Sequence, residues 1–235
     1  MDAASILAEN EMCRARTPVD LCNWVLRKCE ELAASPEAKA FACSGARLPN
    51  KFYDEIYPIS VFAFRQYVDR SGVLVQLNLG NDNFDATVLG DHGTRFIEVT
   101  YAKEGYDRSL RLEALARDGN VCMTGPVSVR GRRGTPARLV SVKPYAQSHI
   151  DIVRAHLSLI ESRVAGKSGV SYGKEHLLLV AVDDHLALAK ESDWALLEEY
   201  IKLWLNKYIL NFGRVVFVGT AGRFFVSRNL LLTRA

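Results

Sequence analysis

Two runs of almost continuous apolar residues place the strongest constraint on the fold. They read "HLLLVAV" at residues 176–182 and "RVVFVG" at residues 214–219. A strand with one face in water alternates apolar and polar residues, whereas a strand that is apolar throughout is covered on both faces. These runs therefore predict strands inside a sheet that carries helices on each side.

The segments around these runs supply the helices and further strands. Apolar stripes at a spacing of three and four predict one helix from Ile150 to Val164 and another from Trp194 to Tyr208. Upstream, the runs "VLVQLNL", "FDATVL" and "RFIEVTYA" are separated by the turn signals "GNDN" and "GDHGT". A hairpin group followed by strands alternating with helices predicts an α/β fold, a mixed β-sheet with an antiparallel hairpin core flanked by helices.

Helical segments are also expected before the strands. Thr17 as a cap and Pro18 at the first helical position predict where one helix begins. Residues 50–70 have a helical pattern that Pro58 should kink or divide. After the short helix "YDRSLRLEALARDG", residues 127–143 are expected to form a loop or a loose hairpin.

The length and the charge of the chain set broad limits. The 235 residues, of which 49% are hydrophobic, are enough to bury one large core. We expect a single α/β domain over residues 1–235, with residues 1–50 as a helical N-terminal extension. The formal net charge of +3 permits an anionic partner without singling one out.

The cysteines and the start of the chain bear on the cellular compartment. The five cysteines are odd in number and include no C-x-x-C pair, so they indicate neither a disulfide framework nor a zinc site. The opening "MDAASILAENEMCRAR" lacks the basic-then-apolar order of a signal peptide, and no apolar run approaches the ~20 residues that span a bilayer. We expect a cytoplasmic protein that does not engage a membrane.

Two carboxylates lie in the predicted hairpin, within residues 78–105. If Gly90 faces Gly93 across the turn, then counting outwards Asp85 faces Glu98, with the two side chains about 5 Å apart on one side of the sheet. Two carboxylates so close repel each other unless one is protonated or a cation lies between them. Magnesium or manganese suits such oxygen ligands.

An alternative register gives these residues ordinary roles. Thr100 follows Glu98 by two positions, so its hydroxyl shares the face of that carboxylate in the predicted hairpin. A slip of one residue would turn Asp85 to the other face and leave it as a turn residue, with Glu98 as an exposed strand residue. Spacing alone leaves both possibilities open.

The hairpin resembles the motif of a known superfamily. "FDATVL", a turn and then "FIEVTYA" resemble the Asp, then Glu-x-Lys core of the PD-(D/E)xK nucleases, in which a hairpin after a helix carries the metal-binding carboxylates. More narrowly, "GNDNFDA" with "IEVTYAKEGYDRSLRLEAL" is similar to a group of uncharacterised bacterial proteins assigned to that superfamily. The resemblance covers residues 50–120 and, more loosely, the next helix and strand. It implies a restriction-endonuclease-like fold.

The resemblance also implies a reaction and its residues. Asp85 and Glu98 match the two metal-binding carboxylates, and the carbonyl of Val99 matches the usual additional metal ligand. Glu55, in the helix before the hairpin, matches an acid that many members carry. Magnesium or manganese held there would activate a water and neutralise charge on a phosphodiester, so hydrolysis of DNA is the expected activity.

One position departs from the motif. Thr100 stands where the superfamily carries a lysine that stabilises the developing negative charge. A catalytic contribution from Thr100 itself would come from its hydroxyl, without a charge. Lys103, or else Arg108 or Arg111, is the expected source of the missing positive charge.

A basic segment at residues 130–143 is expected to bind nucleic acid. A short stretch with two glycines and a proline can follow a phosphate backbone, although such charge runs are also commonly only solvated. Its basic residues are Arg130, Arg132, Arg133, Arg138 and Lys143.

Two other motifs are alternatives to the carboxylate pair as a functional site. Asp183, Asp184 and His185 follow a buried strand, where α/β folds often place ligands, although a strand-to-helix connection explains them equally well. "GTAGR", residues 219–223, lacks the lysine of a phosphate-binding loop and is better explained as a hairpin turn.

The sequence thus supports two function hypotheses. The first is a metal-dependent nuclease that acts on DNA, with the possibility of a homodimer left open. The second is a nuclease-fold module that has lost catalysis and binds nucleic acid or a protein partner, and Thr100 is the residue that favours it. A purely structural or assembly role has no positive signal.

Overall fold

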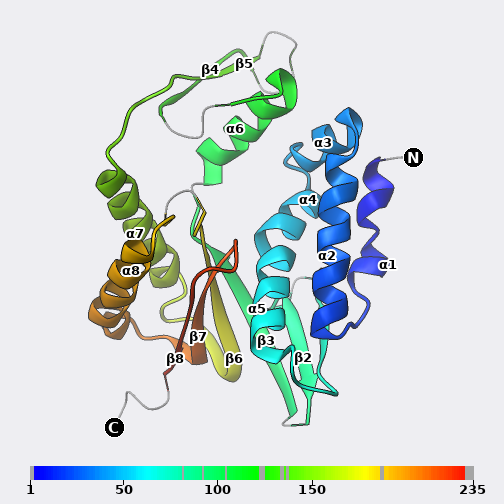
Figure 1. Ribbon diagram of the computed structural model, residues 1–235, viewed down its shortest axis with the longest axis vertical. Helices are drawn as coiled ribbons and strands as arrows, with labels where there is room; N and C mark the ends of the chain where they lie inside the picture. The colour runs from blue at the N-terminus through cyan, green and yellow to red at the C-terminus, as the bar shows by residue number, and fades with distance from the viewer. Residues whose placement is uncertain are drawn as a thin grey trace.

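A six-stranded mixed sheet forms around the two apolar strands, in the order β1-β2-β3-β6-β7-β8 (Figure 1). The computed structural model describes residues 3–80, 82–91, 93–103, 105–121, 125–132, 135, 138–185 and 188–230. The middle of the sheet is parallel, because β3 pairs with β6 and β6 with β7 in the same direction, and the other neighbours are antiparallel. The strands are β1 (Leu74–Leu77), β2 (Ala86–Gly90), β3 (Gly93–Tyr101), β6 (Ser171–Val182), β7 (Asn211–Gly219) and β8 (Phe225–Asn229).

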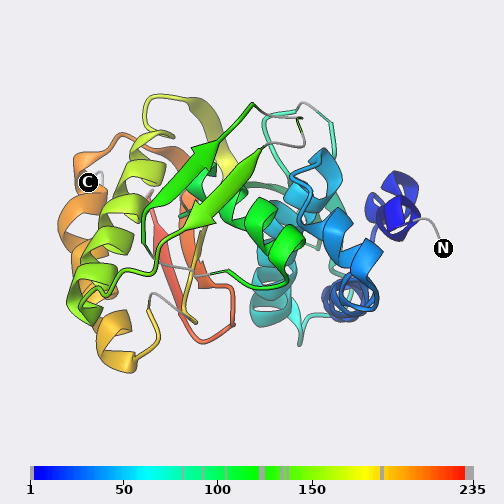
Figure 2. The same cartoon turned by 90° about the horizontal axis from the view of Figure 1, so that it is seen from above.

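Helices cover both faces of this sheet, as the apolar strands require (Figure 2). One face carries η1 (Ala3–Leu7), α1 (Glu9–Met12), α2 (Pro18–Ala33), α3 (Pro36–Ala42), α4 (Arg47–Lys51), η2 (Phe52–Ile56) and α5 (Tyr57–Tyr67). The other face carries α7 (His149–Ala165), α8 (Glu191–Trp204) and η3 (Leu205–Lys207). The α/β prediction with an antiparallel hairpin, a mixed sheet and flanking helices is confirmed at this level.

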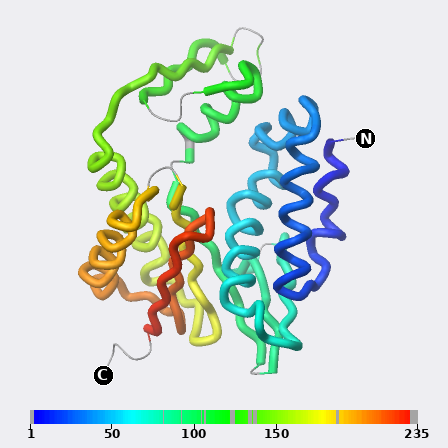
Figure 3. The backbone as a smooth tube through the Cα atoms, viewed as in Figure 1, coloured from blue at the N-terminus to red at the C-terminus, as the bar shows by residue number. Residues whose placement is uncertain are grey.

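A smaller unit lies at one end of the molecule (Figure 3). It consists of α6 (Gly105–Asp118) and a hairpin of β4 (Val127–Arg130) with β5 (Leu139–Val142). Leu110, Ala114 and Val140 form its small apolar core. The loose hairpin expected for residues 127–143 is therefore present.

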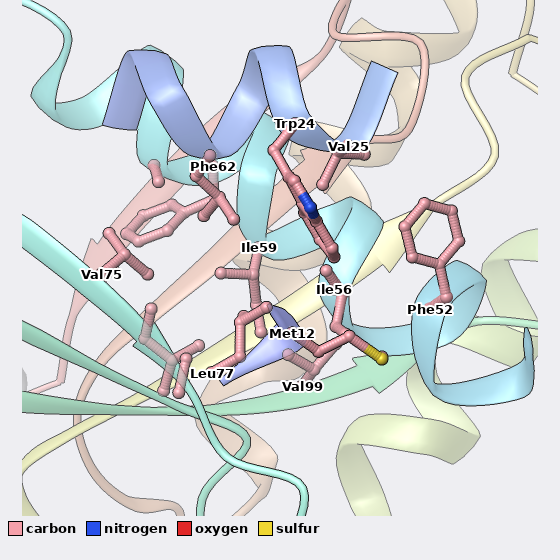
Figure 4. Packing of buried hydrophobic residues seen from close by; sticks show 14 of the residues in the cluster. Met12, Trp24, Val25, Phe52, Ile56, Ile59, Phe62, Val75, Leu77 and Val99 are labelled. Atoms are coloured by element: carbon pink, nitrogen blue, oxygen red, sulfur yellow. The ribbon is translucent and has the colours of Figure 1, made fainter. Parts of the chain in front are cut away.

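Two large apolar clusters fill the space on either side of the sheet. One lies between the sheet and α2 and α5, and the other between the sheet and α7 and α8. Figure 4 shows Ile56 and Ile59 packed between Trp24 of α2 and the strands that carry Leu77 and Val99. Alternate residues of the central strands enter opposite clusters, which explains why those strands are apolar throughout.

Local sequence signals explain where these elements begin and turn. Thr17 caps α2 by accepting a hydrogen bond from the backbone N–H of Asp20, as predicted. Pro58 lies in the first turn of α5, and the preceding η2 is a π-helical turn. Proline has no N–H to donate and its ring crowds the carbonyl four residues back, so the wider turn accommodates it within a continuing helix.

No helix in the described ranges is both long enough and apolar enough to cross a membrane.

Candidate active site

The β2–β3 hairpin has the predicted register, with Gly90 paired to Gly93 and Ala86 to Ile97. Asp85 is the next residue outwards, and its backbone N–H donates to the carbonyl of Ile97 at 2.7 Å. In a regular antiparallel ladder Ile97 would bond to Ala86 alone, so β2 is irregular at its start, and Asp85 lies beside Ile97 rather than directly opposite Glu98. The one-residue slip is absent from Gly90 to Ala86, where the register is the predicted one.

The carboxylate of Asp85 continues the hydrogen bonding of the sheet beyond the start of β2. Its Oδ2 accepts a hydrogen bond from the backbone N–H of Val99 at 2.8 Å. In an antiparallel ladder the N–H and the C=O of one residue point to the same side of the strand. The carbonyl of Val99 is therefore directed to the side on which Asp85 lies.

The side chain of Glu98 lies on one face of β3, and the side chains of Ile97 and Val99 lie on the other face. Val99 enters the α5-side cluster, whereas Leu178, the partner of Glu98 on β6, enters the α7-side cluster. Glu98 Oε1 is 2.5 Å from the Nζ of Lys167 and also accepts from the hydroxyl of Tyr172 at 3.4 Å. Burial raises the pKa of Glu98 and the charge of Asp85 adds to this, while the Lys167 contact opposes it.

Glu55 reaches Asp85 from the π-helical turn η2. Lys51 lies between them, with its Nζ 2.8 Å from Glu55 Oε2 and 3.8 Å from Asp85 Oδ1. Burial raises the pKa of Glu55 to about 7, helped by the negative charge of Asp85 and opposed by Lys51. The helical acid of the motif thus lies beside the first strand carboxylate.

The residues expected to supply the missing positive charge have other partners. Lys103 and Arg108 both form ion pairs with Asp54, the latter at 3.0 Å. Arg111 is buried and donates to the carbonyl of Gly125 at 2.7 Å. Thr100 is half-buried on the face of Glu98. The expectation that Lys103, Arg108 or Arg111 contacts Asp85 or Glu98 is therefore not met.

Two lysines that the sequence analysis missed contact the carboxylates instead. Lys51 precedes Glu55 by four residues, so helical spacing could have indicated that pair. Lys167 lies 69 residues from Glu98, between α7 and β6, and no local pattern links them. A charged cluster, which we call the hairpin cluster, lies at the start of β2. It consists of Lys51, Glu55, Asp85, Glu98 and Lys167.

The oxygen atoms of the hairpin cluster are of the type that binds hard cations. The carboxylates of Asp85 and Glu98 and the Val99 carbonyl are the oxygen ligands that magnesium and manganese prefer. Within the described ranges, no group of three or more His, Cys, Asp or Glu side chains is arranged to hold a metal. The ammonium groups of Lys51 and Lys167 instead offset part of the negative charge of the three carboxylates.

The predicted nucleic-acid-binding residues lie on the β4–β5 hairpin and next to it. Arg130, Arg132 and Lys143 have exposed side chains. Arg138 is held to α6 by an ion pair of 2.7 Å with Glu113. Arg133 lies outside the described residues.

The rival motif after β6 has a structural role. Asp184 is fully buried and accepts hydrogen bonds from the backbone N–H groups of Ala221, Arg223 and Phe224 at 2.6–3.1 Å. These residues form the β7–β8 turn, which is the "GTAGR" segment, so the hairpin-turn interpretation of that segment is confirmed. Asp184 thus stabilises the turn through these three hydrogen bonds.

The fold is α/β, and the carboxylates of Asp85 and Glu98 both lie at its β2–β3 hairpin. No family model, curated protein or solved structure matches this chain.

Proposed function

We propose that this protein is a divalent-metal-dependent phosphodiesterase of the PD-(D/E)xK type that cleaves nucleic acid, with DNA as the expected substrate. The observation that carries the proposal is the arrangement at the start of β2, where the carboxylate of Asp85 binds the backbone N–H of Val99 and lies near enough to Glu98 to raise its pKa. The order of elements supports it, because helix α5, the antiparallel β2–β3 hairpin, helix α7 and the buried strand β6 come in this order, with α6 and the β4–β5 hairpin between β3 and α7. A restriction-endonuclease-like fold belongs to the same proposal.

The residues of the hairpin cluster divide the work of the reaction. Asp85, Glu98 and the Val99 carbonyl would hold magnesium or manganese, which when bound lowers the pKa of a coordinated water and offsets phosphate charge. Glu55 lies beside Asp85 and orients that carboxylate together with Lys51. The exposed cations of the β4–β5 hairpin would contact the phosphate backbone.

Lys167 supplies the positive charge of the motif lysine, which Thr100 replaces in this chain. Glu98 and Thr100 share one face of β3, so a lysine at position 100 would extend to the side from which Lys167 comes. Lys51 approaches from the α4 side, where it binds Glu55. A positive charge on the Glu98 side can stabilise the charge that develops on the phosphate.

A specific observation favours a second candidate function. Lys51 and Lys167 already neutralise part of the negative charge that a metal would balance. The cluster could then be a stable arrangement of ion pairs in a module that binds nucleic acid without cutting it.

Cleavage and binding assays on the same variants separate the two functions. With magnesium or manganese, the wild-type protein should cut DNA, and Glu98→Ala should abolish cutting while binding remains nearly intact. Arg130→Glu with Arg132→Glu should weaken binding and lower the slope of log K against log salt by about one unit for each lost phosphate contact. Binding without cleavage on duplex, single-stranded or RNA substrates supports the module, and neither binding nor cleavage excludes both functions.

A further inference from the structure

A basic cavity is lined by the end of α5 and the tip of the β2–β3 hairpin. Figure 1 shows these elements at the end of the sheet away from α6 and the β4–β5 hairpin. The volume of the cavity is about 770 Å³, within the range of roughly 300–1,000 Å³ typical of small-molecule sites. The end of α5, the tip of the β2–β3 hairpin and the first residues of β6 and β7 surround it. Four cationic side chains line it, those of Arg70, Arg95, Lys174 and Arg214.

These cations lack acidic partners within the described part of the chain. No carboxylate there forms an ion pair with any of the four, although Asp69 and Asp91 line the same cavity. With four cations and two carboxylates, the lining carries a net charge of +2.

Arg214 distinguishes this cavity from an ordinary solvated basic surface. Its guanidinium is half-buried and fixed in place, because Nε donates to Ser227 Oγ at 2.5 Å and Nη2 to Gln66 Oε1 at 2.8 Å. Burial lowers the pKa of Arg214, and the nearby charges of Arg95 and Arg70 lower it further. A half-buried cation among other cations is costly unless an anion balances it.

The backbone also keeps the cavity open. Gly213 lines it, and a Cβ at that position would lie 2.0 Å from the carbonyl oxygen of Lys174. Only glycine therefore allows β7 to approach the irregular start of β6 this closely. Gly90 and Gly93, which also line the cavity, add no side chains at the hairpin tip.

We propose that this cavity binds a small phosphorylated molecule that carries at least two negative charges. Arginine guanidinium groups match phosphate oxygens in geometry and charge. The cations converge on one hollow from four separate segments of the chain, which suits a compact anion better than an extended phosphate backbone. The cavity lies away from the hairpin cluster, because Arg95 projects from the face of β3 opposite to Glu98 and sits nearer the hairpin tip.

Calorimetric titrations test this with inorganic phosphate, inorganic pyrophosphate and AMP, in EDTA and at fixed ionic strength. EDTA removes any contribution of metal, so the result does not depend on nuclease activity. We expect pyrophosphate or AMP to bind, and Arg70→Gln with Arg95→Gln to weaken binding at least tenfold. The matched control, Lys39→Gln with Arg154→Gln, removes two exposed charges elsewhere and should change affinity less than twofold.

A second measurement guards against a variant that fails to fold. Without any probe, Arg70→Gln with Arg95→Gln should melt at or above the wild-type temperature, because it removes like charges that repel each other. If it melts lower, the exposed Lys174→Gln takes its place, with an expected loss of affinity of at least threefold. The proposal is overturned if none of the three probes binds, if the control weakens binding equally, or if only a single-stranded oligonucleotide competes for these residues.

Discussion

At the level of single residues, Lys167 supplies in the proposed function the positive charge that Thr100 does not provide. Lys167→Met should lower the cleavage rate by about 100- to 1000-fold, which is typical of losing one contributor to transition-state charge stabilisation. Metal binding should persist, because Asp85 and Glu98 remain. The measurement is a single-turnover cleavage rate with manganese, beside a calorimetric titration of the same metal.

Rescue by a second substitution separates a catalytic role from a structural one. Thr100→Lys in the Lys167→Met background returns a cation to the same face of β3 and should recover at least tenfold of the lost rate. Lys51→Met provides the comparison from the other side of the cluster. If Lys51→Met abolishes cleavage and Lys167→Met leaves it unchanged, the assignment of the two lysines is reversed.

A buried histidine gives a prediction about pH. His156 accepts a hydrogen bond from the backbone N–H of Asp183, and burial lowers its pKa although the charge of Asp183 opposes this. Below its ordinary pKa of about 6.5, the unfolded chain binds a proton that the folded chain does not, so the free energy of unfolding should fall as the pH decreases from there.

Denaturant titrations between pH 5 and pH 8 measure this effect. The contribution of His156 is at most about 1.4 kcal/mol for each pH unit, and His156→Gln should flatten the acid-side slope accordingly. The exposed His185→Gln is the control and should leave the slope unchanged. An equal slope in wild type and His156→Gln would show that other groups set the acid sensitivity.

The residues of the hairpin cluster differ in how far sequence predicts them. Counting from a turn flanked by glycines predicts the register correctly as far as Ala86 and Ile97, and it fails at Asp85, because the N–H of Asp85 also bonds to Ile97. Glu55 needs the resemblance to a known motif as well. Lys167 comes from a distant loop that only the folded sheet brings to Glu98, so local spacing cannot reveal it.

At the scale of elements, the strands and helices follow from periodicity, because alternation and helical stripes record which side is buried. Pro58 illustrates the limit of this approach. Its sequence position predicts a disturbance of the helix, and the disturbance takes the form of the π-helical turn that carries Glu55. Sequence alone does not choose between a kink, a break and a widened turn.

The β7–β8 turn yields a prediction at this scale. Asp184→Ala would leave three backbone N–H groups without their buried acceptor, and should lower the free energy of unfolding by about 2–5 kcal/mol. Urea titrations measure the change. The folded fraction should retain metal-dependent cleavage at the wild-type rate, whereas loss of metal binding in a folded Asp184→Ala protein would restore the rival site.

At the scale of the whole molecule, pairings between distant segments determine the site and the cavity. The parallel pairing of β3 with β6 places Lys167 and Tyr172 near Glu98, and the approach of β7 to β6 forms one wall of the basic cavity. The fold class is predictable because strands that are apolar throughout need helices packed on both faces of the sheet. The strand order and the cavity are not, since they depend on packing between elements far apart in the chain.

A crystal structure with manganese bound tests the central claim most directly, because anomalous scattering locates the ion without assuming its ligands. We expect a manganese peak within about 2.5 Å of carboxylate oxygens of both Asp85 and Glu98 and of the Val99 carbonyl, with the ammonium of Lys167 turned from Glu98 toward the solvent side of the ion. A peak elsewhere, or none at a manganese concentration that supports cleavage, would contradict it.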